Sequence, residues 1–288
     1  MDLILVRYSE VGLKSRSVRS RFERVLMDNM ISALAREGIE ALVNCDQGRI
    51  YVRTDKARID DGIKVLQRVF GIASVSPVIE TSSDMESIKV TAVKYSKEVL
   101  ADGSTFKIKS RRAGSHPFTS MDIAKDVGEA VLNANQDRGI KVDIHNPGKE
   151  IFVEVRDNQT FVFSEYCEGT GGLPMGSQGR VLVVLEKDTD ALAAWLIMKR
   201  GCRAFAIANE ENEAVRIVKR WDPELKVFPP GDLQAYCRKH KASAVVYGYL
   251  VEDEARIKES IGLPVPAFYP IIGMDGPTIA ARMERIRG

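Results

Sequence analysis

The sequence predicts an α/β protein of three domains, with α+β character in its N-terminal half. Strand and helix patterns follow one another in mixed order along the first 166 residues, whereas residues 180–288 alternate strand and helix in repeated βα units. Between these parts, residues 168–179 contain five glycines in twelve residues, which is typical of a tight or flexible connection. The predicted boundaries are a first domain at 1–80, a second at 82–166, a glycine-rich linker at 167–179 and a third domain at 180–288.

The first 80 residues read as strand, helix, strand, strand, helix, strand. In the first predicted helix, Ser17–Glu37, residues such as Phe22 and Leu26 recur at three- and four-residue steps and form one apolar stripe. We expect Ser17 to cap this helix and Gly38 to end it. The βαββαβ order predicts a small ferredoxin-like domain. The other predicted elements are strands Leu3–Tyr8, Glu40–Asn44, Arg49–Arg53 and Ser74–Ile79, and a helix at Ile59–Val69.

A second mixed module follows, and its most informative strand is Thr105–Arg111. In this strand Phe106 and Ile108 alternate with Lys107 and Lys109. Because the side chains of a strand alternate between its faces, the two lysines should share one face and the apolar residues the other. The remaining predicted elements are a helix near Met85–Leu100, a helix that begins close to Thr119, and strands Lys141–Ile144, Ile151–Arg156 and Thr160–Ser164.

The last hundred residues predict a parallel sheet covered on both faces by helices, in a Rossmann-like arrangement. Strand and helix patterns alternate throughout this part, which is the signature of repeated βα units. The glycine-rich stretch before it opens into a strand and not into a helix, so it lacks the geometry of a phosphate-binding loop. The predicted elements are Arg180–Leu185, Ala191–Lys199, Cys202–Ile207, Asn212–Arg220, Leu225–Phe228, Asp232–Lys239, Ala242–Tyr247, Glu252–Ser260 and Pro277–Ile286.

Charge is locally clustered although the whole chain is nearly neutral. Lysine plus arginine number 42 and aspartate plus glutamate 40, so net charge does not identify a polyanion-binding protein. Residues Arg7–Arg24 hold six basic and two acidic side chains, and Thr105–Lys125 hold five basic and one acidic. These are the two places where a phosphate backbone would be attracted. From Glu186 onward, sixteen basic residues face fifteen acidic ones, so electrostatics alone predicts no RNA binding there.

The second basic cluster contains residue types that suit single-stranded RNA. Arg111 and Arg112 can hold phosphate oxygens in a bidentate manner, and the amides of a helix that starts near Ser120 offer an anion site. The rings of His116 and Phe118 can stack on unpaired bases. The pattern therefore favours an RNA-binding surface.

A structural interpretation of the same stretch stays open. Thr119 and Asp122 form a capping-box pattern, and Phe118 directly before it can act as a hydrophobic staple of the helix. In that case the lysines and arginines are the solvated face of a strand beside a capped helix.

The cysteines and the apolar runs indicate an intracellular protein without metal. Cys45, Cys167, Cys202 and Cys237 lie far apart, with no CxxC or Cys/His spacing, in a chain with three histidines. This usage predicts no structural zinc and no disulfide framework, and it is typical of small buried side chains. The longest apolar runs have the length of strands, and the first ten residues alternate apolar and polar. We therefore expect a cytoplasmic protein that does not associate with membranes.

Six motifs run through the chain in order: VRYSEVGLKSRSVRSRFE, GRIYV, VFGIASVSPV, TFKIKSRRAGSHPFTSMDIAKDVG, DIHNPGKEIFVEVRDNQTFVFSE and EGTGGLPMGSQGRVLVVL. Together they resemble the tRNA 4-thiouridine synthetase family, also called the ThiI type of thiamine biosynthesis. The resemblance covers nearly the whole chain, and no generic fold requires the GxGGLPxGxxG linker. It implies an N-terminal ferredoxin-like domain, a THUMP domain at about 82–166 and a C-terminal adenylating domain of PP-loop type.

The resemblance also implies a partner and a set of contact residues. In that family the first two domains grip the acceptor stem and 3′ end of tRNA. We accordingly expect tRNA as the partner, with a homodimer through the C-terminal domain and a tRNA-modifying enzyme as further candidate partners. The RNA-facing residues implied by motif position are Lys14, Arg16, Arg21, Lys107, Lys109, Arg111, Arg112, Ser115, His116, Phe118, Thr119 and Ser120.

The chain departs from the family where ATP would be activated. After the VLVVL strand the family carries SGGxDS, whose small residues let backbone amides close around the ATP pyrophosphate. Here the stretch reads Glu186, Lys187, Asp188, Thr189, Asp190, so both glycines and both serines are absent. Each carboxylate facing a polyphosphate would cost from ~1 kcal/mol in water to ~4 kcal/mol at a partly buried site. Asp190 is either a remnant of the motif aspartate or an ordinary residue at a helix N-terminus.

We therefore expect a tRNA-binding chain with a degenerate, abridged PP-loop domain, no adenylation activity and no cofactor. The alternative is an active tRNA sulfurtransferase, which would use ATP and magnesium to adenylate O4 of a uridine before sulfur displaces AMP. Cys237 is the one cysteine in the abridged stretch between Phe228 and Ala242, and the sequence assigns it no role. A THUMP-linked methyltransferase would need a glycine-rich cofactor loop after the first C-terminal strand, and none is visible.

Overall fold

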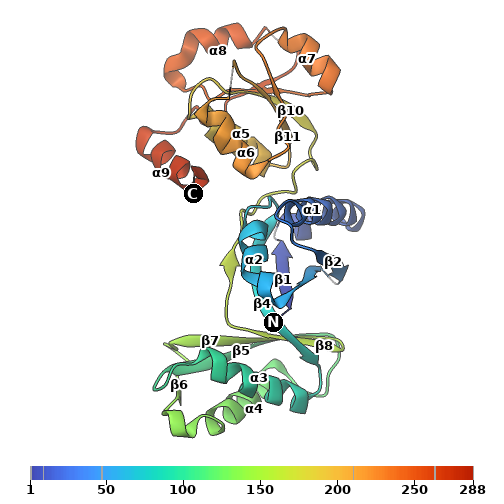
Figure 1. Cartoon of the computed structure of the whole chain (residues 1–288), viewed down its shortest axis with the longest axis vertical. Helices are drawn as coiled ribbons and strands as arrows, with labels where there is room; N and C mark the ends of the chain where they lie inside the picture. Colours follow the sequence, from blue (N-terminus) through green and yellow to red (C-terminus); the bar gives the residue numbers. More distant parts are fainter. Residues whose placement is uncertain (1, 9, 47, 210, 263, 288) are drawn as a thin grey trace. The chain divides into compact units, whose positions relative to one another are not determined.

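The computed structural model describes residues 2–8, 10–46, 48–209, 211–262 and 264–287 (Figure 1). The chain divides into two compact units, each built from several segments. The first unit comprises Met1–Val6, Leu34–Lys64 and Ser74–Glu168. The second comprises Arg7–Ala33, Val65–Ala73 and Gly169–Gly288. Among the described residues, no helix is both long enough and apolar enough to cross a membrane.

One sheet holds most of the first unit together. Its strands follow the order β2-β3-β1-β4-β8-β7-β5-β6, and β9 pairs with β4 beside this path. The strands are β1 (Leu3–Tyr8), β2 (Ala41–Asp46), β3 (Arg49–Thr54), β4 (Ile72–Ser82), β5 (Thr105–Ala113), β6 (Lys141–Val142), β7 (Lys149–Arg156), β8 (Gln159–Phe163) and β9 (Cys167–Glu168). The α-helices between these strands are α1 (Arg16–Arg36), α2 (Ile59–Gln67), α3 (Met85–Val99) and α4 (Ser120–Asn133).

The predicted βαββαβ order of the first 80 residues is confirmed, as β1-α1-β2-β3-α2-β4. The cap predicted for α1 is wrong, because the helix begins at Arg16 and the Arg19 amide donates to the Ser15 carbonyl at 2.8 Å. Ser17 therefore lies inside the first turn. Gly38 does end the helix: its φ of +63° lets its amide and that of Ile39 turn back to the last helical carbonyls.

Helices α3 and α4 cover one face of the strands around β5 (Figure 1). Ile88 and Tyr95 of α3 and Val127 of α4 pack with Phe106 of β5 in one buried core. Strand β5 extends two residues further than predicted, and its parallel pairing with β7 runs as far as Ala113. The basic segment is therefore held along its whole length by a buried neighbour strand.

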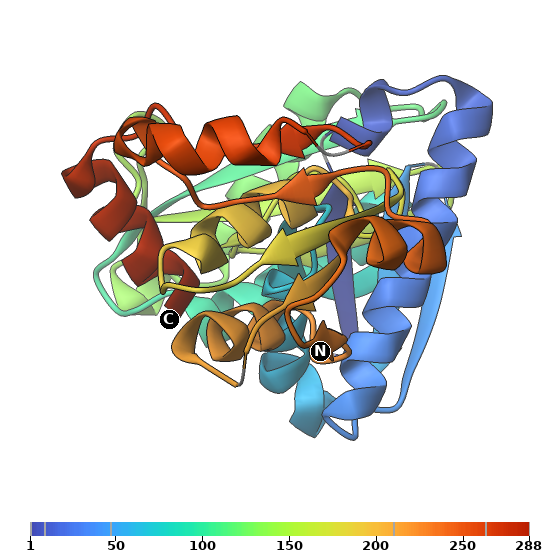
Figure 2. The ribbon, with the colours of Figure 1, turned by 90° about the horizontal axis from the view of Figure 1, so that it is seen from above.

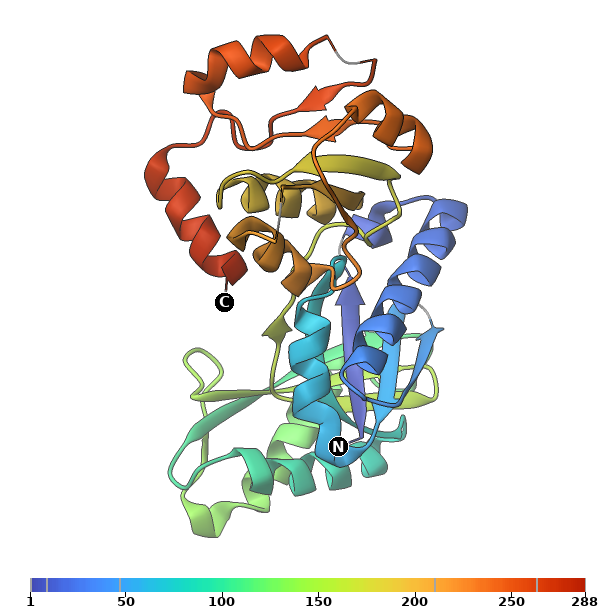
Figure 3. The same cartoon turned by 45° about the horizontal axis from the view of Figure 1, so that its top comes forward.

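The second unit contains a five-stranded parallel sheet in the order β12-β11-β10-β13-β14, as predicted for repeated βα units (Figures 2 and 3). One face packs on α5, α6 and α9, and the other on α7 and α8. Strand β14 was not predicted, because two residues are too few to show an alternation. The elements are β10 (Arg180–Val184), α5 (Asp190–Lys199), β11 (Arg203–Ile207), α6 (Glu213–Trp221), β12 (Val227–Phe228), α7 (Leu233–His240), β13 (Val245–Val246), α8 (Glu254–Ser260), β14 (Ala267–Phe268) and α9 (Gly276–Arg287).

The glycine-rich stretch before β10 is a tightly packed turn. Gly172 has a φ of +79°, and a Cβ at this position would lie 2.2 Å from the Lys199 carbonyl oxygen. At Gly169 a Cβ would lie 2.4 Å from the Ile72 carbonyl oxygen. The chain needs glycine at these two positions because its backbone passes directly against other backbone. The stretch is therefore a tight connection and not a phosphate-binding loop.

Candidate RNA-binding surface and nucleotide loop

Strand β5 presents its lysines beside a carboxylate from the neighbouring strand. Lys107 lies opposite Glu150 in the parallel register of β5 and β7. The Glu150 carboxylate accepts Lys107 Nζ at 2.8 Å and lies 3.6 Å from Lys109 Nζ. The hydrogen bond from Lys107, followed by the charges of both lysines, lowers the pKa of Glu150. The carboxylate is therefore ionised at neutral pH and offsets part of the positive charge of the lysine pair.

The end of β5 carries cations without such compensation. Arg111 and Arg112 are both exposed, and among the described residues neither has a carboxylate partner within ion-pair distance. Arg112 donates to the Gly114 carbonyl at 2.8 Å. Free guanidinium groups on a regular strand are suited to binding phosphate oxygens, since their forked donors match that geometry.

His116 and Phe118 lie side by side in the loop between β5 and α4. Their ring centroids are 5.4 Å apart and their planes differ by 19°. His116 Nε2 lies 3.1 Å from the Ala113 carbonyl oxygen, which fixes the imidazole against the end of β5. Phe118 also packs against the core beneath α3 and α4. Phe118 thus helps to form the core, and its ring also forms a half-buried stack with His116 at the surface.

Helix α4 starts with the capping box that the sequence predicted. Thr119 Oγ1 accepts the Asp122 amide at 3.2 Å, and the Asp122 carboxylate accepts the Thr119 amide at 2.8 Å. The hydrogen bonds that the Thr119 amide and hydroxyl donate to this carboxylate lower the pKa of Asp122, so a negative charge stands at the helix start. Ser115 is exposed and Ser120 half-buried at this end. The cap therefore competes with an external anion for this helix terminus.

The candidates of the first domain belong to the second unit. Lys14 follows the short helix η1 (Glu10–Leu13), and Arg16 begins α1. Lys14, Arg16 and Arg21 are exposed, and the Arg21 guanidinium lies 5.2 Å from the centre of the Phe22 ring. These three cations lie just before or within the first turns of α1.

The loop after β10 is closed onto the side chain of Asp190. Asp190 is buried, and its Oδ2 accepts the backbone amides of Glu186 at 2.7 Å and Lys187 at 2.9 Å. Burial raises the pKa of Asp190, and these two hydrogen bonds act in the opposite direction. The amides that open the loop therefore already donate to a carboxyl oxygen that belongs to the chain itself.

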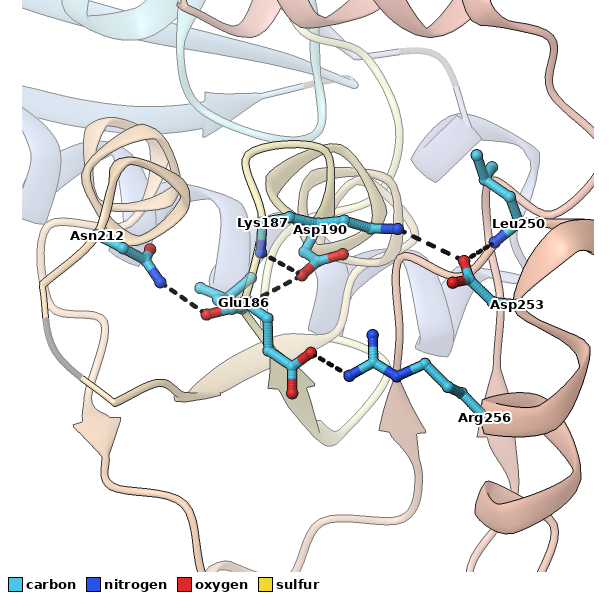
Figure 4. A network of polar contacts seen from close by, with 8 residues as sticks. Glu186, Lys187, Asp190, Asn212, Leu250, Asp253 and Arg256 are labelled. Atoms are coloured by element: carbon cyan, nitrogen blue, oxygen red, sulfur yellow. Dashed lines mark hydrogen bonds and ion pairs between the residues drawn. The ribbon is translucent and has the colours of Figure 1, made fainter.

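Charged side chains around this loop form ion pairs with one another, as Figure 4 shows for the contacts of Glu186 and Lys187. Glu186 pairs with Arg256 of α8, and Lys187 Nζ lies 3.5 Å from the Asp253 carboxylate. Asp188 pairs with Arg287 of α9 at 2.9 Å. Ion pairs thus connect the loop to Asp253, to α8 and to α9.

A cavity of about 570 Å³ lies beside this loop, at the carboxyl ends of the strands. From β10, the strands β11 and β12 follow on one side of the sheet and β13 and β14 on the other. Open parallel sheets usually bind ligands at such a switch point. Tyr247 and Tyr249 line the cavity with ring centroids 4.7 Å apart, and the Arg256 guanidinium lies 5.0 Å from the Tyr249 ring centre. The two stacked rings give the cavity one aromatic wall, which suits a planar ring.

The loop beside the cavity does not fit a polyphosphate. Arg256 is the one cation among the described lining residues, and Glu186 already pairs with it. Glu186 and Glu259 add two carboxylates to the lining, and Asp190 fills the amides of the loop. An incoming pyrophosphate would have to displace a buried carboxylate and face the other two.

The cysteines do not have the properties of activated nucleophiles. Cys237 is buried in the core beneath α7, and burial raises the pKa of its thiol. Burial likewise raises the pKa of Cys167 and Cys202. A nucleophilic cysteine needs a lowered pKa, so these three thiols are better explained as side chains that pack against their neighbours.

Sequence reasoning missed the partners of the site residues. It did not find Glu150 beside the lysines, and it did not find Arg256, Tyr247 and Tyr249 at the cavity. The only available signal for the tyrosines was their position at the end of a predicted strand. The register of β5 and β7 brings Glu150 to the lysines, and a contact of α8 brings Arg256 to Tyr249. No local pattern encodes either contact.

Comparisons with known proteins place two segments of the N-terminal part of the chain in recognised groups. A family model described as the ThiI ferredoxin-like domain matches residues 3–76, and one described as the THUMP domain matches residues 82–165. A probable tRNA sulfurtransferase of Methanobrevibacter smithii is 40% identical over 212 residues, which cover 72% of this chain and 53% of that protein. Another, of Methanocaldococcus jannaschii, is 35% identical over 238 residues, covering 77% of this chain and 62% of that protein.

Solved structures support the same grouping at the level of the fold. PH1313 from Pyrococcus horikoshii is 30% identical, with a TM-score of 0.86 over 100% of both chains. A 4-thiouridine synthetase solved as an RNA complex with bound ATP is 22% identical, with a TM-score of 0.78 over 99% of this chain and 84% of that one. At that identity the second likeness shows the fold alone. The match takes in about half the length of the first curated relatives, 53% for the M. smithii protein.

Proposed function

Because the chain belongs to the ThiI-type tRNA sulfurtransferase family, we propose that it binds tRNA at the acceptor stem and 3′ end. The observation that carries the proposal is the exposed, uncompensated pair Arg111 and Arg112 at the end of β5, next to the stacked rings of His116 and Phe118. Guanidinium groups supply the phosphate contacts, and the ring stack supplies a platform for an unpaired base. The THUMP match over this segment supports binding of RNA by the same surface.

The proposal also assigns the C-terminal parallel-sheet domain a role without adenylation. Adenylyl transfer depends on positioning the phosphates and on stabilising their charge. In this chain Asp190 fills the loop amides, and Arg256 is paired with Glu186. Within the described residues the loop amides are occupied and the lining cation is paired, and this supports a role without adenylation.

A second candidate function is an active, ATP-dependent tRNA sulfurtransferase. Its support comes from the relatives named probable tRNA sulfurtransferase and from the cavity beside the loop, which is large enough for a nucleoside. The comparisons favour this candidate, whereas the local geometry of the loop favours a chain that binds tRNA without activating it. The two differ in one observable, the tRNA-dependent consumption of ATP.

Titration of fluorescent tRNA with the full chain tests tRNA binding. Removing Arg111 and Arg112 together by Arg111→Ala/Arg112→Ala should weaken binding at least roughly tenfold and make the dependence of log K on log salt less steep by roughly 1.5 to 2. Lys94→Ala/Lys97→Ala on α3 is the matched control, because it removes the same charge from exposed positions of the same module. Equal effects of the two double variants would overturn the assignment.

A further inference from the structure

A groove in the second unit gathers four cations that the proposed function does not use. It has a volume of about 390 Å³ and lies between α5 and α9, which pack against each other (Figure 3). Its apolar floor includes Leu192, Trp195 and Ile286. The cations that line it are Lys199 and Arg200 at the end of α5 and Arg282 and Arg285 on one face of α9.

These cations gather without a matching set of carboxylates. Arg282 and Arg285 are exposed, and neither has an ion-pair partner among the described residues. Lys199 Nζ lies 5.0 Å from the centre of the Trp195 ring, and burial together with the charges of Arg285 and Arg282 lowers its pKa. Like charges that line one groove repel one another, so the cluster lowers the stability of the free protein. The arrangement is typical of a site for an external polyanion.

The groove is continuous with the cations at the start of α1. Arg200 Nη1 lies 3.3 Å from the Glu10 carboxylate in η1, and η1 leads directly to Lys14 and Arg16. All of these residues belong to the second unit. From Glu186 onward charge is balanced by count, yet four of the sixteen basic residues line this one groove.

We propose that the groove between α5 and α9 binds the phosphate backbone of the tRNA that Lys14 and Arg16 also contact. The proposal rests on the proposed function and extends the RNA-binding surface onto the parallel-sheet domain. An apolar floor beneath a cationic rim fits a ribose-phosphate chain, since the phosphates meet the arginines while the sugars cover the floor. In this role the domain contributes affinity without any chemistry.

The experiment measures tRNA binding by full-length chains across a salt series. Arg282→Ala/Arg285→Ala should weaken binding of a tRNA transcript roughly three- to thirtyfold and make the salt slope less steep by roughly 1.5 to 2. Arg282→Lys/Arg285→Lys should restore most of the slope. The matched control is Arg238→Ala/Lys239→Ala, which removes the same charge from exposed positions of α7 in the same unit.

The outcomes separate this inference from the proposed function. If Arg111→Ala/Arg112→Ala weakens binding while Arg282→Ala/Arg285→Ala matches its α7 control, the groove proposal is wrong and the proposed function stands. If only Arg282→Ala/Arg285→Ala weakens binding, the groove proposal is supported and the assignment of tRNA binding to β5 is wrong. A wild-type chain that does not bind tRNA would overturn both.

Discussion

The carboxylate of Asp190 occupies the space in front of Gly248, where a Cβ would lie 2.1 Å from Asp190 Oδ1 and 2.8 Å from its Cα. The same carboxylate accepts two loop amides through its other oxygen. Because Gly248 has no side chain, the loop after β10 can close around Asp190. This contact between Gly248 and Asp190 explains why the loop amides bind Asp190. In the family that the sequence resembles, the ATP pyrophosphate is expected at this position.

Gly248→Ala should destabilise the protein, because the added methyl group meets both the carboxylate and the backbone of Asp190. We expect a loss of roughly 1 to 3 kcal/mol in the free energy of unfolding. Gly273→Ala is the control, since a Cβ there has no atom within 4 Å. Denaturant titration of the two variants and the wild type gives the comparison. Equal stability of Gly248→Ala and Gly273→Ala would show that the loop closes differently.

Asp190 should make the stability of the protein depend on pH. Burial raises its folded pKa above the ordinary value of 3.8, so just above that value the native state retains a proton that the unfolded chain has released. The contribution of this carboxyl to stability is therefore full below 3.8 and is lost as pH rises through the raised folded pKa.

The comparison is with Asp190→Asn, which cannot ionise. The free energy of unfolding of the wild type relative to this variant should fall as pH rises from 3.8 through the raised folded pKa, because only the wild type acquires a buried charge. Urea titrations at several pH values measure this difference. A difference that stays constant, or that grows with pH, would contradict the buried position of the carboxylate.

Glu150→Gln should strengthen tRNA binding. The carboxylate offsets the charge of Lys107 and Lys109, and its lowered pKa keeps it ionised at neutral pH. Releasing two lysines should raise the affinity by roughly threefold to tenfold and make the salt slope steeper by roughly 1. Glu98→Gln on α3 is an exposed carboxylate control in the same module. If both variants bind like the wild type, the lysine face does not meet RNA.

His116→Ala should lower affinity only for tRNA with an intact single-stranded 3′ end. The imidazole stacks on Phe118 and lies beside one backbone carbonyl, so its loss removes a base platform without opening the core. We expect a cost of roughly 1 to 3 kcal/mol in binding, with thermal stability nearly unchanged. Phe118→Ala should lower both binding and stability, because Phe118 also packs on the core.

The discriminating substrate is a tRNA transcript that lacks its 3′ overhang. With this transcript the affinities of wild type and His116→Ala should coincide. If His116→Ala weakens binding of both transcripts equally, the ring stack does not contact the overhang.

The parts of the fold that local patterns encode could be predicted from the sequence. The alternation of Lys107 and Lys109 with Phe106 placed the lysines correctly on one face, and the capping box at Thr119 located the start of α4. Ser17 failed as a cap because several polar residues precede α1, and the hydrogen-bonded turn begins earlier than the best cap pattern.

Contacts between distant segments could not be predicted. Glu150 reaches the lysines through the register of two parallel strands, and Gly248 meets Asp190 across 58 positions of sequence. The cations of α5 and α9 likewise gather only when the two helices pack. Nothing in the residues around each position records its partner, so charge balance along the sequence concealed the basic groove.

The most direct test of the account is tRNA-dependent release of pyrophosphate from ATP by the purified full chain, with magnesium and a sulfide donor present. The tRNA should be at a concentration where binding is complete by anisotropy in the same sample. We predict no release above the background without protein, because Asp190 fills the loop amides and no free cation lines the described part of the cavity. Pyrophosphate release that requires tRNA and is abolished by Asp190→Ala would contradict the account and establish the sulfurtransferase alternative.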